Sequence, residues 1–227
     1  MKQQLKVILT STLCVFAIVL IIYIIGKTMS NKTATGGNPA EKNSSGTVEE
    51  VTTVTDSFLL GEDIKQQLLT VNPYSRSGQK LNKVNAIVIH YVGNPGTTAA
   101  QNRNYFEGLK DSKTVSASSH YIVGLEGEII QCVPLEEISY ASNNRNSDTI
   151  AIECCHPDVT GKFNKKTYNS LVKLTAALLK TYGLSVEEGL IRHYDVTGKE
   201  CPLYFVRNED EWYGFKLAVD SELKSKK

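Results

Sequence analysis

Three residues of this sequence have side chains that suit a zinc ion: His90, His193 and Cys201. His193 and Cys201 stand eight positions apart in a polar loop, and His90 lies far earlier in the chain. Two imidazoles and a thiolate leave the fourth tetrahedral position open for water, which is the arrangement of catalytic rather than structural zinc sites. Bound zinc lowers the pKa of water to about 7 and polarises carbonyl groups. The trio therefore indicates a site for one catalytic Zn²⁺ ion, although a His and a Cys in a polar loop are more often not metal ligands.

Short apolar runs are expected to position these residues at strand ends. Residues 86–90 (Ala-Ile-Val-Ile-His) predict a buried strand that carries its histidine at the carboxyl edge. Residues 190–193 predict another strand of this kind. In a third predicted strand, 149–154, the two-residue period puts Glu153 on the face opposite Ile152.

Helical patterns alternate with these strands. Thr98 can cap a helix that runs to about Lys110, and apolar residues from 168 to 182 follow helical spacing up to a stop at Gly183. The runs at 120–123 and 128–133 flank a glycine-bounded turn, which is typical of a hairpin. Strands interleaved with helices predict an α/β domain with a mixed central β-sheet flanked by helices.

The N-terminus has the pattern of a membrane anchor. Residues 7–26 carry no charge and are rich in Ile, Leu and Val; as a helix they would rise roughly 30 Å, the thickness of the hydrocarbon core of a bilayer. A cleaved signal peptide is usually shorter and ends in a small-x-small site. Here the run ends Ile-Ile-Gly-Lys, which favours an uncleaved anchor over 1–27, although Thr33-Ala34-Thr35 leaves cleavage open.

A tether and a folded domain are expected to follow the anchor. Residues 28–56 are rich in Thr, Ser, Asn, Gly, Lys and Glu, and this composition predicts a disordered tether. The folded domain is then expected over 57–227. Lys and Arg residues are nearly balanced on the two sides of the predicted span, so the charge rule does not decide its orientation. With only six residues ahead of the span, the simplest arrangement leaves them in the cytoplasm.

Charge and cysteine content exclude some classes of partner and scaffold. The net charge is +1, which gives no reason to expect nucleic acid as a partner. The sequence does not show an oligomeric state, and a monomer is the default expectation. The cysteines beyond the predicted span are too few for a disulfide scaffold. Cys154 and Cys155 should point to opposite faces of their strand. One of them could meet Cys132, but buried thiols are the simpler expectation.

Four stretches together resemble the type 2 N-acetylmuramoyl-L-alanine amidases, a family related to the phage lysozyme amidases and the peptidoglycan recognition proteins. The resemblance covers residues from about 72 to 205, and its motifs occur in the family's order and spacing. They are residues 87–90 (Ile-Val-Ile-His), 118–123 (Ser-Ser-His-Tyr-Ile-Val), 149–153 (Thr-Ile-Ala-Ile-Glu) and 193–202, which contains His193, Lys199, Cys201 and Pro202.

The resemblance implies roles for five residues. His90, His193 and Cys201 match the zinc ligands of the family. Glu153 matches the carboxylate that many members use as a general base, and Lys199 matches a lysine thought to stabilise the oxyanion. These roles suit amide hydrolysis, which needs a proton taken from water, a stabilised tetrahedral O⁻ and a proton returned to the leaving amine.

Other residues near this pattern are expected to be structural, or depart from the family. His120 opens a strand and is left out of the metal ligands, and His156 is expected at the surface. Many relatives carry Trp-His-Ala-Gly where this chain reads Ser-Tyr-Ala-Ser, so that Tyr140 stands in place of a substrate-side histidine. The following residues, 143–145, are polar enough to bind a stem peptide, but a solvated loop is the simpler expectation.

These observations predict a membrane-tethered zinc amidase domain over 57–227 that cuts the bond between N-acetylmuramic acid and L-alanine in peptidoglycan. The cell wall lies outside the membrane, so the domain is expected on the extracytoplasmic side of a single span. Two alternatives stay open. One is a peptidoglycan-binding module of the same fold that does not hydrolyse its ligand. The other is a cell-wall peptidase in which Cys201 is the nucleophile.

Overall fold

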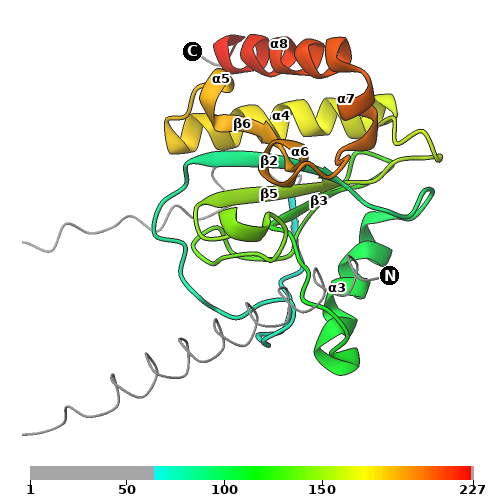
Figure 1. The fold of residues 1–227 in the computed structure, drawn as a ribbon, viewed down its shortest axis with the longest axis vertical. Coiled ribbons are helices and arrows are strands. Elements are labelled where there is room, and N and C mark those ends of the chain that lie inside the picture. The colour runs from blue at the N-terminus through cyan, green and yellow to red at the C-terminus, as the bar shows by residue number, and fades with distance from the viewer. Residues whose placement is uncertain (1–63, 226–227) are drawn as a thin grey trace, which may run out of the picture. The chain divides into compact units, whose positions relative to one another are not determined.

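The computed structural model describes residues 64–225, in which a six-stranded mixed sheet lies between helices (Figure 1). The strand order is β1-β4-β3-β5-β2-β6; the pair β3 and β4 is antiparallel, and all other neighbours are parallel. The predicted mixed α/β sheet is confirmed. The strands are β1 (Ile64–Gln66), β2 (Ala86–Tyr91), β3 (Tyr121–Val123), β4 (Ile129–Gln131), β5 (Thr149–Cys154) and β6 (Leu190–Arg192).

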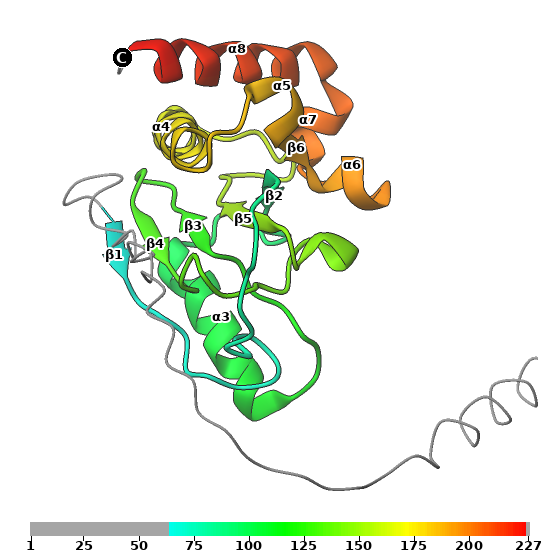
Figure 2. The same ribbon diagram turned by 90° about the vertical axis from the view of Figure 1, so that its left-hand side faces the viewer.

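Helices cover both faces of the sheet. α4 packs on one face with α8 outside it, and α3 lies on the opposite face (Figure 2). The helices are α3 (Ala99–Ser112), the 3₁₀ turn η2 (Asn143–Arg145), α4 (Lys165–Tyr182), α5 (Val186–Gly189), α6 (His193–Thr197), α7 (Leu203–Arg207) and α8 (Glu209–Ser225).

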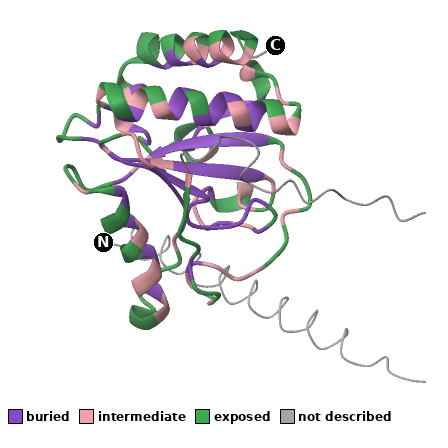
Figure 3. Ribbon diagram, turned by 180° about the vertical axis from the view of Figure 1, so that it is seen from behind, coloured by how far each residue is buried: buried purple, intermediate pink, exposed green. Residues whose placement is uncertain are grey.

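Alternation along the central strands separates two cores, and strands β2 to β6 between them are mostly buried (Figure 3). Ile87 and Ile89 of β2 pack with α4 and α8, whereas Ile122 of β3 packs with α3. Ile122, Glu153 and His90 are register partners across β3, β5 and β2, so their side chains share the α3 face of the sheet. Helix α3 packs against β3 and β4. His90 and Glu153 therefore lie on the same face of the sheet as α3, on the neighbouring strands β2 and β5.

The expected elements match the observed ones, including their end signals. The Thr98 side chain accepts a hydrogen bond from the Gln101 N–H in a capping box that begins α3. Gly183 ends α4 with φ 62°, a left-handed conformation that glycine adopts without steric cost. The hairpin β3–β4 and the short strand β6 are also where the sequence predicts them. Helix α8 is not among the expected elements, although Trp212, Phe215 and Val219 follow helical spacing and are its buried residues.

Two expectations about single side chains have opposite outcomes. Cys132, Cys154 and Cys155 are free, buried thiols, and Cys154 and Cys155 lie in different cores, as expected. The expectation for His156 is wrong, because only 2% of this residue is exposed. Its ring nitrogens lie 2.6 Å from the carbonyl oxygens of Val92 and Asp158, since the loop after β5 folds against the end of β2.

The N-terminal predictions fall outside the described residues. The span at 7–26 and the tether at 28–56 both precede residue 64, so the anchor and the domain boundary at 57 stay predictions. Between residues 64 and 225, no helix combines the length and apolar character needed to cross a membrane.

His120 is a fully buried structural histidine, and its contacts fix its proton. Its Nδ1 accepts a hydrogen bond from the Ala151 N–H at 3.0 Å, so the ring proton is on Nε2, which donates to the Glu137 carbonyl at 2.9 Å. A second proton would have to bind to Nδ1, where it would face the Ala151 N–H, which is itself a donor. Burial lowers the pKa of His120 to about 4, although the contacts with Glu137 oppose this shift.

We expect this histidine to make the domain acid-labile. The unfolded chain binds its proton near pH 6.5, and the folded chain only near pH 4, so the stabilisation is complete above pH 6.5 and is lost as the pH falls towards 4. This difference corresponds to about 3 kcal/mol in the free energy of unfolding. Urea denaturation of wild type and His120→Asn at several pH values tests this. Parallel pH profiles for the two proteins would contradict it.

Candidate metal centre

The structure brings His90, His193 and Cys201 together at one edge of the sheet. His90 lies near the end of β2, His193 begins α6, and Cys201 precedes α7. Their ligand atoms all lie within 4.8 Å of one another, and His90 Nδ1 is 3.9 Å from Cys201 Sγ. Zinc bonds of 2.0–2.3 Å in a tetrahedron place neighbouring ligand atoms about 3.5 Å apart. All three residues are buried, so their number, type and spacing fit one metal ion of this kind.

The topology explains why residues so distant in the sequence meet. β2 and β6 are parallel neighbours with Ile89 opposite Arg192, so the next residues on both strands, His90 and His193, emerge side by side. Their ring centroids are 4.6 Å apart. Helix α6 then ends at Gly198 with φ 77°, and the chain turns back towards the sheet. The Tyr194 N–H donates to the Cys201 carbonyl at 2.9 Å, which closes this loop.

Arg192 stabilises the segment that contains His193 through several side-chain contacts. Its side chain is 8% exposed and donates to Asp195 at 2.9 Å and to Glu209 at 2.6 Å. It also donates to the Phe205 carbonyl and lies over the Trp212 ring. This one guanidinium thus joins α6 to α7 and α8, and it holds the backbone next to His193.

Burial sets the protonation of the three metal-binding side chains. Burial lowers the pKa of both His90 and His193; His193 and then Lys199 add to the shift at His90, and Lys199 adds to it at His193. Both shifts favour the neutral imidazole, the form that binds metals. Burial, reinforced by Glu153, raises the pKa of the Cys201 thiol to about 12, against the opposing effect of a hydrogen bond from the Tyr91 backbone. A divalent cation would reverse this balance, because a coordinating thiol loses its proton.

Glu153 lies next to the cluster on the same face of the sheet, opposite His90 in the β5–β2 register. Its Oε2 atom is buried and, within residues 64–225, has no hydrogen-bond partner. Burial raises the pKa of the Glu153 carboxyl to about 8, and Lys199 opposes this shift. A carboxyl group whose pKa lies near neutral pH can both accept and return a proton.

Lys199 lies at the solvent-exposed side of the cluster. The residue is exposed, yet its charge lowers the pKa of His90, His193, Glu153 and Cys201. The five residues singled out in the sequence therefore form one group, with the Glu153 carboxyl on its buried side and the Lys199 ammonium on its exposed side.

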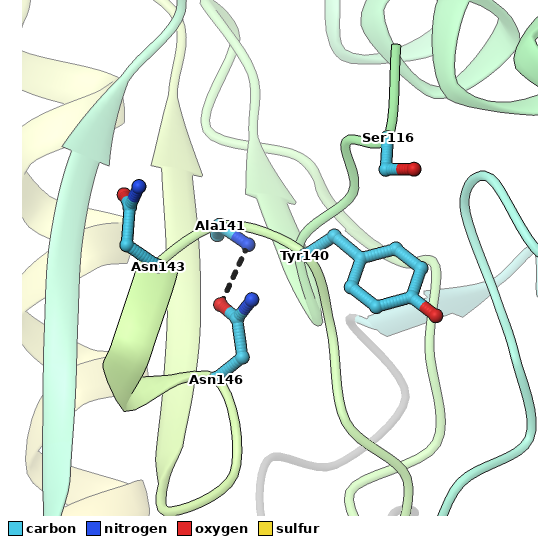
Figure 4. A pocket seen from close by; sticks show the side chains of 5 residues that line it. All are labelled: Ser116, Tyr140, Ala141, Asn143 and Asn146. Carbon is cyan, nitrogen blue, oxygen red and sulfur yellow. Dashed lines mark hydrogen bonds between the residues drawn. The ribbon is translucent and has the colours of Figure 1, made fainter. Parts of the chain in front are cut away.

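Figure 4 shows a polar pocket of about 260 Å³, one residue of which, Asn143, also contacts His193. It is lined by Ser116, Tyr140, Ala141, Asn143 and Asn146. Tyr140, which stands where many relatives have a histidine, is thus a pocket residue.

Residues 143–145 are solvated as expected, with Asn143 and Asn144 exposed, but Asn143 also contacts a candidate metal ligand. These residues form η2, and the Asn143 amide oxygen lies 2.9 Å from His193 Nε2. Ser142 also approaches the cluster, with its Oγ 3.3 Å from His90 Nε2. Sequence reasoning gave no role to Ser142 and did not connect Asn143 with the histidines. No local signal could have done so, because only the fold brings η2 beside α6.

Comparisons with known proteins agree with the fold and identify the family. The family described as N-acetylmuramoyl-L-alanine amidase matches residues 80–203, a range that contains the whole cluster. A probable N-acetylmuramoyl-L-alanine amidase from Bacillus licheniformis is 36% identical over 165 residues, which are 67% of this chain and 46% of that protein. The N-acetylmuramoyl-L-alanine amidase BlyA from Bacillus subtilis (strain 168) is 31% identical over 178 residues, 70% of this chain and 47% of that protein.

The chain spans about half the length of these curated relatives. Among solved structures, a mutant endolysin from Bacillus subtilis is similar, with 26% identity and a TM-score of 0.58. That similarity covers 69% of this chain and 97% of the endolysin chain. Nearly the whole endolysin chain therefore has the same fold as the matched part of this chain.

Proposed function

Because this chain belongs to the N-acetylmuramoyl-L-alanine amidase family, we propose that it hydrolyses the amide bond between N-acetylmuramic acid and L-alanine in peptidoglycan. The observation that carries this proposal is the cluster of His90, His193 and Cys201 beside the buried carboxyl of Glu153. Two neutral imidazole nitrogens and one sulfur are ligands that zinc prefers. A carboxyl group beside them could act as the base in hydrolysis.

His90, His193 and Cys201 would hold the ion. When bound, zinc supplies Lewis-acid polarisation of the scissile carbonyl and makes water a stronger acid. Glu153 takes the proton from the attacking water and returns it to the leaving amine of L-alanine. Oε2 is buried and has no hydrogen-bond partner within residues 64–225, and this unused acceptor beside the cluster supports the role.

Lys199 is proposed to stabilise the oxyanion that forms when water adds to the carbonyl. Its charge already acts on the cluster, although the side chain is exposed. We expect Lys199→Ala to lower kcat by about 10- to 100-fold, near or below the usual effect of removing an oxyanion donor, because solvent screens an exposed ammonium group. Zinc content should stay unchanged. Lys173→Ala on the exposed face of α4 is the matched control. An unchanged kcat for Lys199→Ala would exclude this role.

Digestion of purified cell wall tests the function directly. The purified full-length chain, loaded with zinc, should release new L-alanine amino termini without new reducing sugars. New reducing sugars would indicate a glycosidase instead. A chain that binds the wall and releases neither end group would be a binding module.

The location of the enzyme is a further part of the proposal. The uncharged run at 7–26 and the polar stretch at 28–56 support a single membrane span followed by a tether that holds the catalytic domain on the wall side. Fractionation of cells that express the full chain should place it in the membrane fraction, with the domain accessible to protease in spheroplasts. A chain lacking residues 1–27 should leave that fraction. Equal distribution of the two chains would contradict the anchor.

A further inference from the structure

Two adjacent residues that are not among the candidate ligands, Ser142 and Asn143, each contact one histidine of the cluster. Ser142 Oγ lies 3.3 Å from His90 Nε2, and Asn143 Oδ1 lies 2.9 Å from His193 Nε2. Both contacts thus involve the Nε2 atom of the ring. The opposite nitrogen of His90, Nδ1, faces the Cys201 sulfur. One short turn therefore contacts the Nε2 atoms of both histidine rings.

The Asn143 contact determines which nitrogen of His193 carries the proton. An amide oxygen only accepts hydrogen bonds, so it holds the proton on Nε2 and leaves the lone pair on Nδ1 for a metal. A hydrogen bond of this kind also fixes the orientation of the ring, and in metal sites it typically contributes 10- to 100-fold to metal affinity. Ser142 is less selective, because a hydroxyl group can donate or accept, and its contact is longer.

The turn that presents Asn143 is itself held in an unfavourable conformation. Asn143 has φ 53°, one of two positive values among the non-glycine residues of 64–225. Two hydrogen bonds to Asn146 Oδ1 stabilise the turn, from the Ala141 N–H at 3.1 Å and the Ser142 N–H at 2.6 Å. Glycine would adopt this φ without cost, but it has no oxygen to offer. Asparagine adopts this conformation more readily than other non-glycine residues, and it also supplies the oxygen that contacts His193.

We propose that Asn143, presented by the turn at Ser142, is the positioning residue of the metal centre. It acts through His193, by keeping the ring in the tautomer and orientation that direct Nδ1 to the metal. This inference rests on the metal site of the proposed function, and it assigns a role to a residue outside the ligand set. It also separates Asn143 from Asn144 and Arg145, which share the same polar stretch; Arg145 is instead paired with Asp148.

Three variants of the full-length chain separate the side-chain oxygen from the backbone conformation. Asn143→Ala removes the acceptor and keeps the backbone strain. Asn143→Gly removes the acceptor and relieves the strain. Asn143→Asp keeps an acceptor in the same place. The dissociation constant for zinc, measured by competition with a chromophoric chelator, is the main readout, and the thermal midpoint of the metal-free protein is the second.

We expect zinc to bind about 10- to 100-fold more weakly to Asn143→Ala and Asn143→Gly, and within about threefold of wild type to Asn143→Asp. Metal-free Asn143→Gly should unfold at a temperature at least as high as Asn143→Ala. The absorption bands of bound Co²⁺ should change in the alanine and glycine variants and not in the aspartate variant.

Wild-type zinc affinity in Asn143→Gly would overturn the inference, and so would a loss of affinity in Asn143→Asp as large as in Asn143→Ala. These measurements do not involve peptidoglycan. If the wild-type chain binds zinc and the variants behave as expected but no wall is cut, the proposed function fails while the role of Asn143 stands.

Discussion

Replacing Cys201 with alanine is expected to abolish hydrolysis of peptidoglycan and to remove the bound metal. Cys201 supplies the only sulfur of the cluster, and two imidazoles alone hold zinc far more weakly than three ligands do. Activity should fall to background, a loss of at least about a thousandfold, because the proposed chemistry has no other source of activated water. Zinc content by atomic absorption and release of L-alanine amino termini are the two measurements.

Cys132→Ala is the matched control for this substitution. Cys132 is another fully buried thiol, but it lies in the α3 core, away from the cluster. Its replacement should cost stability through the cavity that it leaves, yet preserve both metal content and kcat. Chelation then separates the zinc enzyme from a thiol peptidase. A zinc enzyme loses activity to a chelator and recovers it with zinc, whereas a peptidase that uses Cys201 as its nucleophile would be inactivated by alkylation and not by chelation.

Glu153→Gln is expected to lower kcat by about 10²- to 10⁴-fold, the usual range for loss of a positioned acid–base group. The amide has nearly the shape of the carboxyl group but cannot take a proton from water, so zinc content should stay at the wild-type level. Glu136→Gln, an exposed residue elsewhere in the fold, is the control. A Glu153→Gln enzyme with full kcat would remove the carboxyl from the proposed mechanism.

The same substitution should make the metal-free protein more stable at alkaline pH. Burial raises the pKa of Glu153 to about 8 in the folded state, against about 4.5 when unfolded, so the folded chain holds the proton over this interval. Stability therefore falls as the pH rises from about 4.5 to 8. Glutamine has no proton to lose. The thermal midpoint of Glu153→Gln should equal that of wild type near pH 4 and exceed it most above pH 8. A difference that does not change with pH would contradict the raised pKa of Glu153.

Much of the fold could be predicted because its signals are local. The apolar runs of β2 and β5, the cap at Thr98 and the stop at Gly183 each act within a few residues. The burial of His156 could not be predicted in this way, because its partners include the carbonyl of Val92 on another loop. Helix α8 carries few buried residues for its length, so its apolar pattern is sparse.

The candidate site likewise has residues that the sequence predicts and contacts that only the fold reveals. The types of His90, His193 and Cys201 indicated a metal, and their position at strand ends followed from the apolar runs. The fold alone revealed the contact between Asn143 and His193, because these residues are distant in sequence and the turn at 143 has no sequence signal for the metal. Direct ligands carry a chemical signature in their residue type, whereas the residues that orient them take many types.

The pairing of β2 with β6 also has a consequence for folding. β6 is an edge strand and the last strand in chain order, so the cluster cannot form until the chain has been synthesised past Cys201 and a long loop has closed. Shorter segments that fold earlier lack the complete donor set. A metal ion that binds only the closed arrangement holds the edge of the sheet to its centre, and each tenfold rise in its free concentration above Kd adds about 1.4 kcal/mol to the free energy of unfolding. Metal supply would then determine how long the finished domain survives as well as how fast it works.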